Sequence, residues 1–389
     1  MFVIIFHKKN LKGKYLLQLN KNLKIAIIGS RGYPYVYSGY ETLVKELSER
    51  LVKSGHKVTV YCHKSLFKEK PKVVNGINLV YTPSIETKFL SQLVNSFFSF
   101  VHVCFTNVDV LLVVNSANGP FGILTKIFAK KSFINVDGLE WLRPKWKGLG
   151  SVYFYFASKL ATIFFDEIIT DSYEMNKIYK NLFQKDSTII AYGSTMTKTK
   201  GNKELNKYGI EKNSYYLIVG RLIPDNNSHL ICEGYLTSSS NKSIVIVGDV
   251  PYNDKYAKKI KSKANKKIIF TGYINSQDSL TELYKNCFGY IHGHEFGGTN
   301  PTMINALDLN CEIIALDTIF NREMLKQKEV IFFKKNIESI ESSIIKFEKK
   351  INFLKKINKD YTLPNNYLWE TVTNKYIGLF EKSVQPKVS

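Results

Sequence analysis

Short runs of β-branched and aromatic residues alternate with longer amphipathic segments along the whole chain. Each run is followed by Gly, Ser, Asn or Asp and then by apolar residues at helical spacing. This alternation is typical of parallel sheets that helices cover on both faces, so it predicts an α/β protein. The expected strands are Ile25–Ile28, Val58–Tyr61, Val110–Val114, Phe133–Val136, Ile168–Thr170 and Thr188–Ile190 in the first half, and Tyr216–Val219, Ile244–Val247, Ile268–Phe270, Gly289–His292, Ile313–Ala315 and Val330–Phe333 in the second.

The chain has 389 residues, which is too long for one ordinary core and predicts two domains. The polar stretch Thr195–Lys207 lacks apolar periodicity, which predicts a linker between the two domains. Residues 89–114 are apolar with polar interruptions, and we expect a buried helix followed by a strand there. The predicted organisation is a basic and apolar extension over residues 1–22, a first domain over 23–195, a second over 208–360, and an amphipathic helix over 365–382 that packs back on the first domain.

Two glycine-bearing loops join a strand to a helix, one in each half of the chain. In the second half, Gly297-Gly298 precedes a helix that opens at Pro301, where free N–H groups and the helix dipole favour an anion. In the first half, glycines at 29, 32 and 39 follow a buried strand, but their spacing is not the dinucleotide fingerprint. A single glycine pair more often marks an ordinary turn than a binding site. Because a second glycine-bearing loop occurs in the opposite half of the chain, the sequence favours two anion sites.

The net charge of +22 comes mostly from lysine, and no nucleic-acid recognition motif accompanies it. We therefore expect no nucleic-acid partner. An anionic membrane surface suits the lysines better, because residues 1–24 carry six lysines and no acidic residue beside an apolar run. A disordered extension or an early start codon is the competing and slightly preferred interpretation of this segment.

The five cysteines are scattered and never spaced as Cys-x-x-Cys. This argues against a zinc site or a disulfide framework and predicts a reducing cytoplasm. No Asp-x-Asp occurs, so we expect no metal-held diphosphate.

Five stretches occur in the order found in one enzyme family, and together they span residues 23–382. The chain resembles a glycosyltransferase of family 4 with the GT-B fold, and more closely the bacterial rhamnosyltransferase-like branch that builds capsule and cell-wall polysaccharides. The stretches are Ile27–Pro34 with Ser38–Glu41, Val136–Trp141 with Lys145-Trp146, Val219–Asn227, Val247–Tyr252, and His292–His294 with Gly297-Gly298-Thr299-Asn300-Pro301.

This resemblance implies two Rossmann-like domains that face each other across a cleft. It also implies retaining transfer of rhamnose or another hexose from a dTDP- or UDP-linked donor to a hydroxyl of a lipid-linked glycan. Such an enzyme needs no cofactor or metal and is expected in the cytoplasm, peripheral at the inner face of the cell membrane. Because the barrier lies in charge separation toward the leaving diphosphate, fixed hydrogen-bond donors should supply most of the stabilisation.

Arg221, directly after a strand, is the best candidate for a bidentate phosphate clamp, with a surface ion pair as the alternative. Asp137 orients a sugar hydroxyl or only caps the turn before Gly138. Glu41 binds hydroxyls or only complements a helix dipole, and Trp141 stacks on a sugar or is simply buried. The resulting assignment is Asp137, Arg221 and Glu295 as catalytic; Gly32, Arg221, Asn226, His294, Gly297, Gly298, Thr299, Asn300 and Asn305 as donor-binding; and Glu41, Trp141 and Arg143 as acceptor-binding.

The chain departs from the family at several positions. Asn305 stands where a glutamate usually accepts the ribose hydroxyls, and an amide carries no charge for that task. Gly297 takes the place of the first glutamate of that pair, and Asn226-Asn227 that of a phosphate-binding lysine. A degenerate nucleotide-sugar-binding subunit of a polysaccharide complex is therefore the alternative function. A sugar-nucleotide epimerase is a third hypothesis, but the sequence does not clearly show the acid and base residues that such an enzyme needs.

Overall fold

The computed structural model describes residues 22–34, 38–85, 87, 90–146, 148–198, 203–250 and 254–385. These residues divide into two compact units. The first unit holds the described residues up to Asn135, then Ala157–Ile168, and those from Thr373 onward; the second holds Val136–Phe156 and Ile169–Val372. The predicted extension over 1–22 lies almost wholly outside the described residues. The predicted domain limits differ from these units and stay a prediction.

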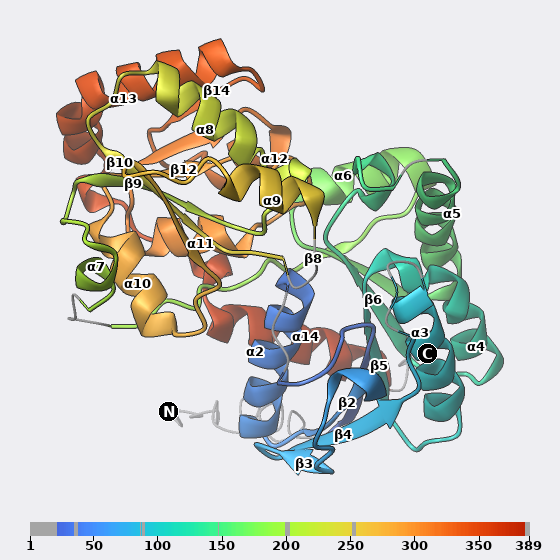
Figure 1. Cartoon of the computed structure of the whole chain (residues 1–389). Helices are drawn as coiled ribbons and strands as arrows, with labels where there is room; N and C mark the ends of the chain where they lie inside the picture. The colour runs from blue at the N-terminus through green and yellow to red at the C-terminus, as the bar shows by residue number, and fades with distance from the viewer. Residues whose placement is uncertain are drawn as a thin grey trace, which may run out of the picture. The chain divides into compact units, whose positions relative to one another are not determined.

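The first sheet has eight strands in the described part of the chain, in the order β3-β4-β2-β1-β5-β6-β7-β8 (Figure 1). The pairs β4-β2, β2-β1, β1-β5, β5-β6 and β7-β8 are parallel, and the pair β3-β4 is antiparallel. Asn75 and Gly76 join these two strands with φ of 50° and 77°, the positive values that a type I′ hairpin needs. This Asn-Gly signal was present in the sequence, but the hairpin was not predicted. The strands are β1 (Lys24–Ile28), β2 (Lys57–His63), β3 (Val73–Val74), β4 (Ile77–Thr82), β5 (Val110–Val114), β6 (Ser132–Val136), β7 (Glu167–Thr170) and β8 (Thr188–Ile189).

Helices connect these strands, and one of them differs from expectation. The segment over residues 89–114 forms a helix, α3, and then strand β5, as predicted. The helix is buried only in part: Leu90, Phe97, Phe98 and Val101 are exposed. Its buried residues are Phe100, Val103 and Cys104 together with three serines and an asparagine. The described helices of this half are α2 (Gly39–Lys53), α3 (Leu90–Cys104), α4 (Gly122–Ile127), α5 (Leu149–Phe164) and α6 (Tyr173–Phe183).

The second sheet has six described strands, and their pairings are parallel in the order β11-β10-β9-β12-β13-β14. Figure 1 shows α8 and α13 on one face of this sheet and α10 and α11 on the other. The predicted fold class, two parallel-sheet α/β domains, is confirmed. The strands are β9 (Tyr215–Val219), β10 (Ser243–Val247), β11 (Ile268–Gly272), β12 (Gly289–His292), β13 (Ile313–Leu316) and β14 (Ile331–Phe333); the helices are α7 (Lys203–Tyr208), α8 (Ser228–Thr237), α9 (Lys255–Lys261), α10 (Gln277–Asn286), α11 (Pro301–Asp308), α12 (Ile319–Met324) and α13 (Ile337–Ile357).

The segment predicted as a linker is structured over part of its length. Helix α7 begins at Lys203, and Thr197 donates a hydrogen bond of 2.6 Å to Asp278 on α10. The last helix, α14 (Trp369–Val384), contacts β6, where Asn135 donates to the Tyr376 hydroxyl at 3.0 Å. The ring of Phe380 lies 5.2 Å from that of Phe133 on the same strand. Among the helices that the structure describes, none combines the length and the apolar character needed to span a bilayer.

Close backbone packing in the first unit makes one glycine irreplaceable. A Cβ on Gly119 would lie 1.8 Å from the carbonyl oxygen of Ala157 on α5, whereas a Cβ on Gly378 in α14 would meet nothing within 4 Å. We predict that Gly119→Ala lowers the free energy of unfolding by about 2 kcal/mol or more, because the backbones must separate. Gly378→Ala, the matched control, should raise it by about 0.5–1 kcal/mol through helix propensity. Urea titration of both variants tests this, and equal effects would contradict the packing described.

Candidate functional site

The two central strands of the second sheet end beside each other at a topological switch point. From β9 the chain proceeds to β10 on one side, while β12 pairs with β9 on the other. Ligands of open parallel sheets bind outside the carboxyl ends of the strands at such a point. Each of the two strands is followed at this edge by glycine, Gly220 after β9 and Gly293 after β12.

These glycines let the two strand ends and their loops touch. A Cβ on Gly220 would lie 2.8 Å from the ring of His294, and one on Gly293 would lie 2.4 Å from the carbonyl oxygen of Asn226. Asn226 donates its side-chain amide to the carbonyl of Arg221 at 2.8 Å. Asn227 donates to the carbonyl of Gly293 at 2.9 Å. Both asparagines are buried and hold the loop after β9 in place.

A basic cluster with two internal carboxylates lies at this edge. Arg143 pairs with Glu140 at 2.6 Å and with Asp225 at 3.2 Å, and Lys145 pairs with Glu140 at 3.0 Å. Burial alone would raise the pKa of Glu140, but Arg143 and Lys145 lower it to about 2. Burial lowers the pKa of Lys145, and although Glu140 opposes this shift, Arg143 and Arg221 add to it. The cluster thus contains three cations, Arg143, Lys145 and Arg221. Its two carboxylates are Glu140 and Asp225, so the net charge is positive.

Two stacked histidines end strand β12. The rings of His292 and His294 have centroids 4.5 Å apart at an interplanar angle of 23°. Burial lowers the pKa of His292 to about 3, and burial with His292, Arg221 and Arg143 lowers that of His294 well below its ordinary value. His292 Nδ1 bonds the Tyr290 hydroxyl at 2.9 Å, while within the described residues His294 Nδ1 is buried without a partner. His294 is therefore an uncharged imidazole beside the cations.

The predicted anion site at the start of α11 is occupied by protein groups. The N–H of Gly298 donates to the Asp137 carbonyl at 3.2 Å, and the N–H of Thr299 donates to the Asp171 carboxylate at 2.7 Å. The N–H of Asn300 points at the Met324 sulfur at 3.4 Å. The predicted contact of these groups with a diphosphate would require these bonds to break. The φ of 118° at Gly297 does require glycine, as the sequence suggested.

Asp171 and Tyr192 are the residues of this region that sequence reasoning missed. Asp137 accepts a hydrogen bond of 2.6 Å from the Tyr192 hydroxyl. Asp171 is buried, and burial together with the nearby Asp137 carboxylate raises its pKa well above the ordinary value. A Cβ on Gly298 would lie 1.8 Å from Asp171 Oδ1, so only glycine fits there. Asp171 directly follows strand β7, just as Asp137 directly follows β6. Because the sequence shows this position after a predicted strand, Asp171 could have been singled out in the same way as Asp137.

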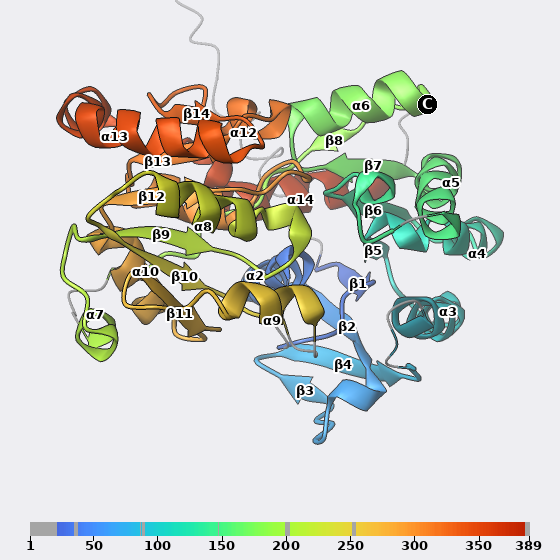
Figure 2. The ribbon, with the colours of Figure 1, turned by 45° about the horizontal axis from the view of Figure 1, so that its top comes forward.

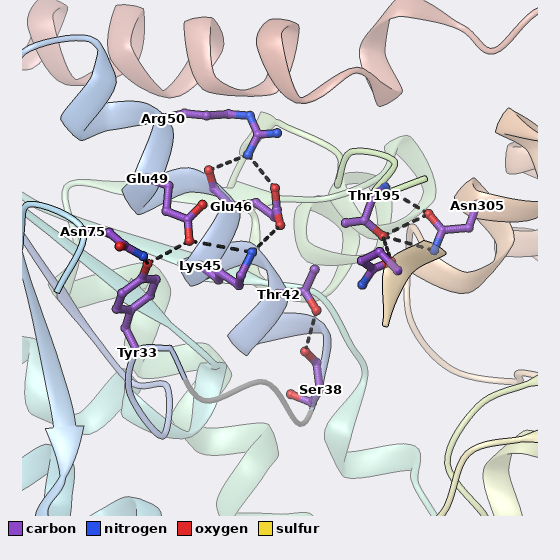
Figure 3. A network of polar contacts seen from close by, with 11 residues as sticks. Tyr33, Ser38, Thr42, Lys45, Glu46, Glu49, Arg50, Asn75, Thr195 and Asn305 are labelled. Atoms are coloured by element: carbon purple, nitrogen blue, oxygen red, sulfur yellow. Dashed lines mark hydrogen bonds and ion pairs between the residues drawn. The ribbon is translucent and has the colours of Figure 1, made fainter. Parts of the chain in front are cut away.

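Asn305 binds the segment that follows β8 (Figure 3). Its oxygen accepts from the Thr195 N–H at 3.1 Å, and its NH₂ group donates to the Thr195 hydroxyl at 3.3 Å. The side chain is buried. Asn305 thus connects α11 to the chain between the two sheets, and its predicted contact with a nucleotide remains a prediction.

Glu295, predicted to be catalytic, pairs with Lys335 at 2.6 Å. Trp141, predicted to bind acceptor, has ring centroids of Tyr155 and Phe183 at 5.9 and 6.2 Å, so it belongs to an aromatic cluster. Arg143, also predicted on the acceptor side, lies among the cations described above, and its contact with an acceptor stays a prediction.

Gly32 and Glu41 belong to the first unit. Gly32 has φ of 124°, and a Cβ there would lie 2.8 Å from Cys62. Glu41 is buried and accepts from the Arg31 N–H at 3.1 Å and from the Ser38 hydroxyl, so it holds the glycine loop. Tyr33 in the same loop donates to Glu49 on α2 at 2.7 Å (Figure 3). The carboxylate of Glu41 therefore has a structural role in this unit, and its acceptor contact stays a prediction.

Comparison with known proteins adds two domain matches. Residues 180–361 match the family described as glycosyl transferases group 1, and residues 94–195 match a domain of unknown function (DUF1972). No curated protein matches the chain. In the residues that the structure describes, no group of three His, Cys, Asp or Glu side chains is placed to hold a metal ion.

Solved structures resemble almost the whole chain. Sucrose-phosphate synthase from Thermosynechococcus elongatus aligns with a TM-score of 0.77 at 12% identity, over 92% of this chain and 98% of its own. The fold is GT-B. Anabaena HepE in complex with UDP-glucose aligns with a TM-score of 0.74 at 13% identity, over 93% of this chain and 100% of its own. WaaG, a GT-B neighbour described as a glycosyltransferase involved in lipopolysaccharide biosynthesis, aligns with a TM-score of 0.70 at 13% identity, over 92% and 99%. The domain match and the GT-B fold together support a glycosyltransferase.

Asp171 should destabilise the protein at neutral pH. Asp171→Asn keeps an oxygen that accepts from Thr299 but removes the charge, so we expect the free energy of unfolding at pH 7 to rise by about 1 kcal/mol. Since the folded-state pKa of Asp171 is raised, the wild type gains stability as the pH falls through it, and the advantage of the variant should shrink. Urea titrations between pH 4.5 and 8 measure this. A variant that is less stable than the wild type at pH 7 would contradict the charge argument.

Glu140 should stabilise the protein with the opposite pH dependence. Its folded-state pKa of about 2 lies below the ordinary value of 4.5, so its stabilisation is complete above pH 4.5 and is lost as the pH falls towards 2. We expect Glu140→Gln to lower the free energy of unfolding by about 2–3 kcal/mol at pH 6 and by progressively less on acidification. Glu69→Gln, at an exposed loop position, is the control, and its free energy of unfolding should equal that of the wild type at each pH.

Proposed function

We propose that this chain is a retaining glycosyltransferase of family 4, in the rhamnosyltransferase-like branch. It moves rhamnose or another hexose from a dTDP- or UDP-linked donor to a hydroxyl of a lipid-linked glycan in surface polysaccharide synthesis. The observation that carries the proposal is the basic cluster of Arg221, Arg143 and Lys145 beside the carboxyl ends of β9 and β12. A nucleoside diphosphate is the ligand that this switch point and its net charge fit.

The cluster supports the chemistry of a leaving diphosphate. In the reaction the bond from the anomeric carbon to the diphosphate oxygen breaks, the acceptor oxygen bonds to that carbon, and the acceptor proton passes to the diphosphate. Negative charge therefore grows on the diphosphate as the bond lengthens. The Arg143 guanidinium, already fixed by Glu140 and Asp225, stabilises that charge without reorganising, which is the main source of such catalysis. No metal ion is needed for this step.

His294 suits the sugar end of the donor. Its low pKa keeps it neutral at pH 7, so one ring nitrogen donates and the other accepts. A neutral imidazole orients a sugar hydroxyl without repelling the positive charge that develops at the anomeric carbon. Asp137 and Glu295 complete the proposed catalytic set on the same unit.

Two neighbours bear on donor and acceptor. HepE has been solved with UDP-glucose, which supports a nucleotide-sugar donor here, and WaaG acts in lipopolysaccharide biosynthesis, which supports a glycan acceptor carried on lipid. A protein that uses such an acceptor works in the cytoplasm at the inner face of the membrane.

One observation favours a second candidate, a nucleotide-sugar-binding subunit without transfer. The Asn305 amide is engaged with Thr195, so this position offers no carboxylate to ribose hydroxyls. Such a subunit would bind donor and release no product.

A donor panel with matched arginine variants tests the proposal. UDP- and dTDP-hexoses are offered with lipid-linked acceptor, and one of them should be consumed with sugar appearing on the lipid. Arg221→Ala should lower kcat/KM by about 100-fold or more. Arg322→Ala, which removes an exposed arginine paired with Asp317, should leave it unchanged. Calorimetric binding without transfer would establish the subunit instead, and no binding by any donor would overturn both.

A further inference from the structure

Two cysteine side chains of the second unit share one hydrogen-bond acceptor. Cys287 follows helix α10 and donates its thiol to the Tyr284 carbonyl at 3.1 Å. Cys311 lies beyond the end of α11 and donates to the same carbonyl at 3.2 Å. A hydrogen bond between the two thiols raises the pKa of Cys287 well above its ordinary value, and burial adds to this shift. The two sulfur atoms are therefore neighbours, although β12 and α11 lie between them in the sequence.

The backbone of the second sheet brings the two cysteines together. Strands β12 and β13 are parallel neighbours (Figure 2), with Tyr290 opposite Ile313. One residue stands between Cys287 and the start of β12, and one stands between Cys311 and the start of β13. Adjacent strands lie about 5 Å apart, and a disulfide joins Cα atoms that are about 4.4–6.8 Å apart. The fold therefore places these thiols at a distance that a disulfide can span.

The other three cysteines have different surroundings. Cys62 and Cys104 donate to backbone carbonyls at 3.7 and 3.8 Å. Cys232 belongs to the hydrophobic core of the second unit. All three are buried, as is Cys311, whereas Cys287 is half-buried. Cys287 is therefore the thiol that a small reagent in solution reaches first.

We propose that Cys287 and Cys311 form a reversible disulfide by exchange with a disulfide of low molecular mass. The Cys287 thiolate attacks one sulfur of the reagent, which forms a mixed disulfide and releases the other half of the reagent. The Cys311 thiolate then attacks Cys287 Sγ, so that the bond between the cysteines forms and the second half leaves. The cysteines lose two electrons to the reagent, and their two protons pass to the released thiolates.

The Tyr284 carbonyl favours return to the reduced state. Both thiols donate to this oxygen, and the sulfur atoms of a disulfide carry no proton to donate. Oxidation therefore removes two donors from a carbonyl of a buried residue, which costs free energy and makes the disulfide easier to reduce. The raised pKa of Cys287 leaves little thiolate at neutral pH, so the exchange is slow. The pair thus responds to sustained oxidation, as redox-sensing disulfides of reducing compartments do.

Mass spectrometry of the full chain tests this proposal without nucleotide sugar, so the result is independent of the proposed function. The folded protein is incubated with excess oxidised glutathione at about pH 8.5, where more of each thiol is ionised. We expect the intact mass to fall by two hydrogen atoms, a peptide pair linked through Cys287 and Cys311 after digestion, and full reversal by dithiothreitol. Cys104→Ser, the matched control, lacks another buried thiol and should form the same link.

Two further variants test the order of the steps. Serine at either position keeps a hydroxyl that donates to the Tyr284 carbonyl, and circular dichroism checks that each variant is folded. Cys311→Ser should stop at a stable mixed disulfide on Cys287, because the second thiol is missing. Cys287→Ser should take up about tenfold less glutathione or lower still, since Cys311 is buried. Wild-type protein that stops at the mixed disulfide, that links Cys287 to another cysteine, or that leaves Cys287 unmodified would overturn the proposal.

Discussion

The contact between the ends of β9 and β12 is the constraint on which the candidate site depends. Gly220 follows β9 and Gly293 follows β12. A Cβ on Gly220 would lie 2.8 Å from the His294 ring, and one on Gly293 would lie 2.4 Å from the carbonyl oxygen of Asn226. Because the strand ends come this close, the loop after β9 reaches the loop after β12. Arg221 and Asp225 are thereby placed near His294. Any side chain at these glycines would separate the groups whose charges define the site.

Charge balance explains how so many ionisable groups coexist there. Glu140 and Asp225 fix the Arg143 guanidinium, and the neutral state of His294 avoids a fourth cation. Arg221 and Lys145 leave the cluster positive, as a diphosphate site requires. At the start of α11 the balance is different, since Asp171 lies near another carboxylate, Asp137, and is itself held by the Thr299 N–H. The two regions would respond to pH in opposite directions.

The sequence predicted the elements that depend on local patterns. Strands such as Tyr216–Val219 and the glycines at 297 and 298 follow from residue type and spacing, and so does the position of Arg221. The ion pair between Arg143 and Asp225 joins residues 82 positions apart, and the bond between Thr299 and Asp171 spans 128. The spacing of apolar residues along the sequence does not indicate which distant residues form such pairs. The exposed apolar side chains of helix α3 were missed for a related reason, because apolar content alone does not say which of them face the sheet.

We propose that the basic cluster at the ends of β9 and β12 holds a diphosphate. A crystal structure of the protein with bound UDP or dTDP tests this most directly. We predict that phosphate oxygens lie within hydrogen-bond distance of the Arg221 guanidinium, beside His294. A bound nucleotide whose phosphates lie away from Arg221 would contradict the claim.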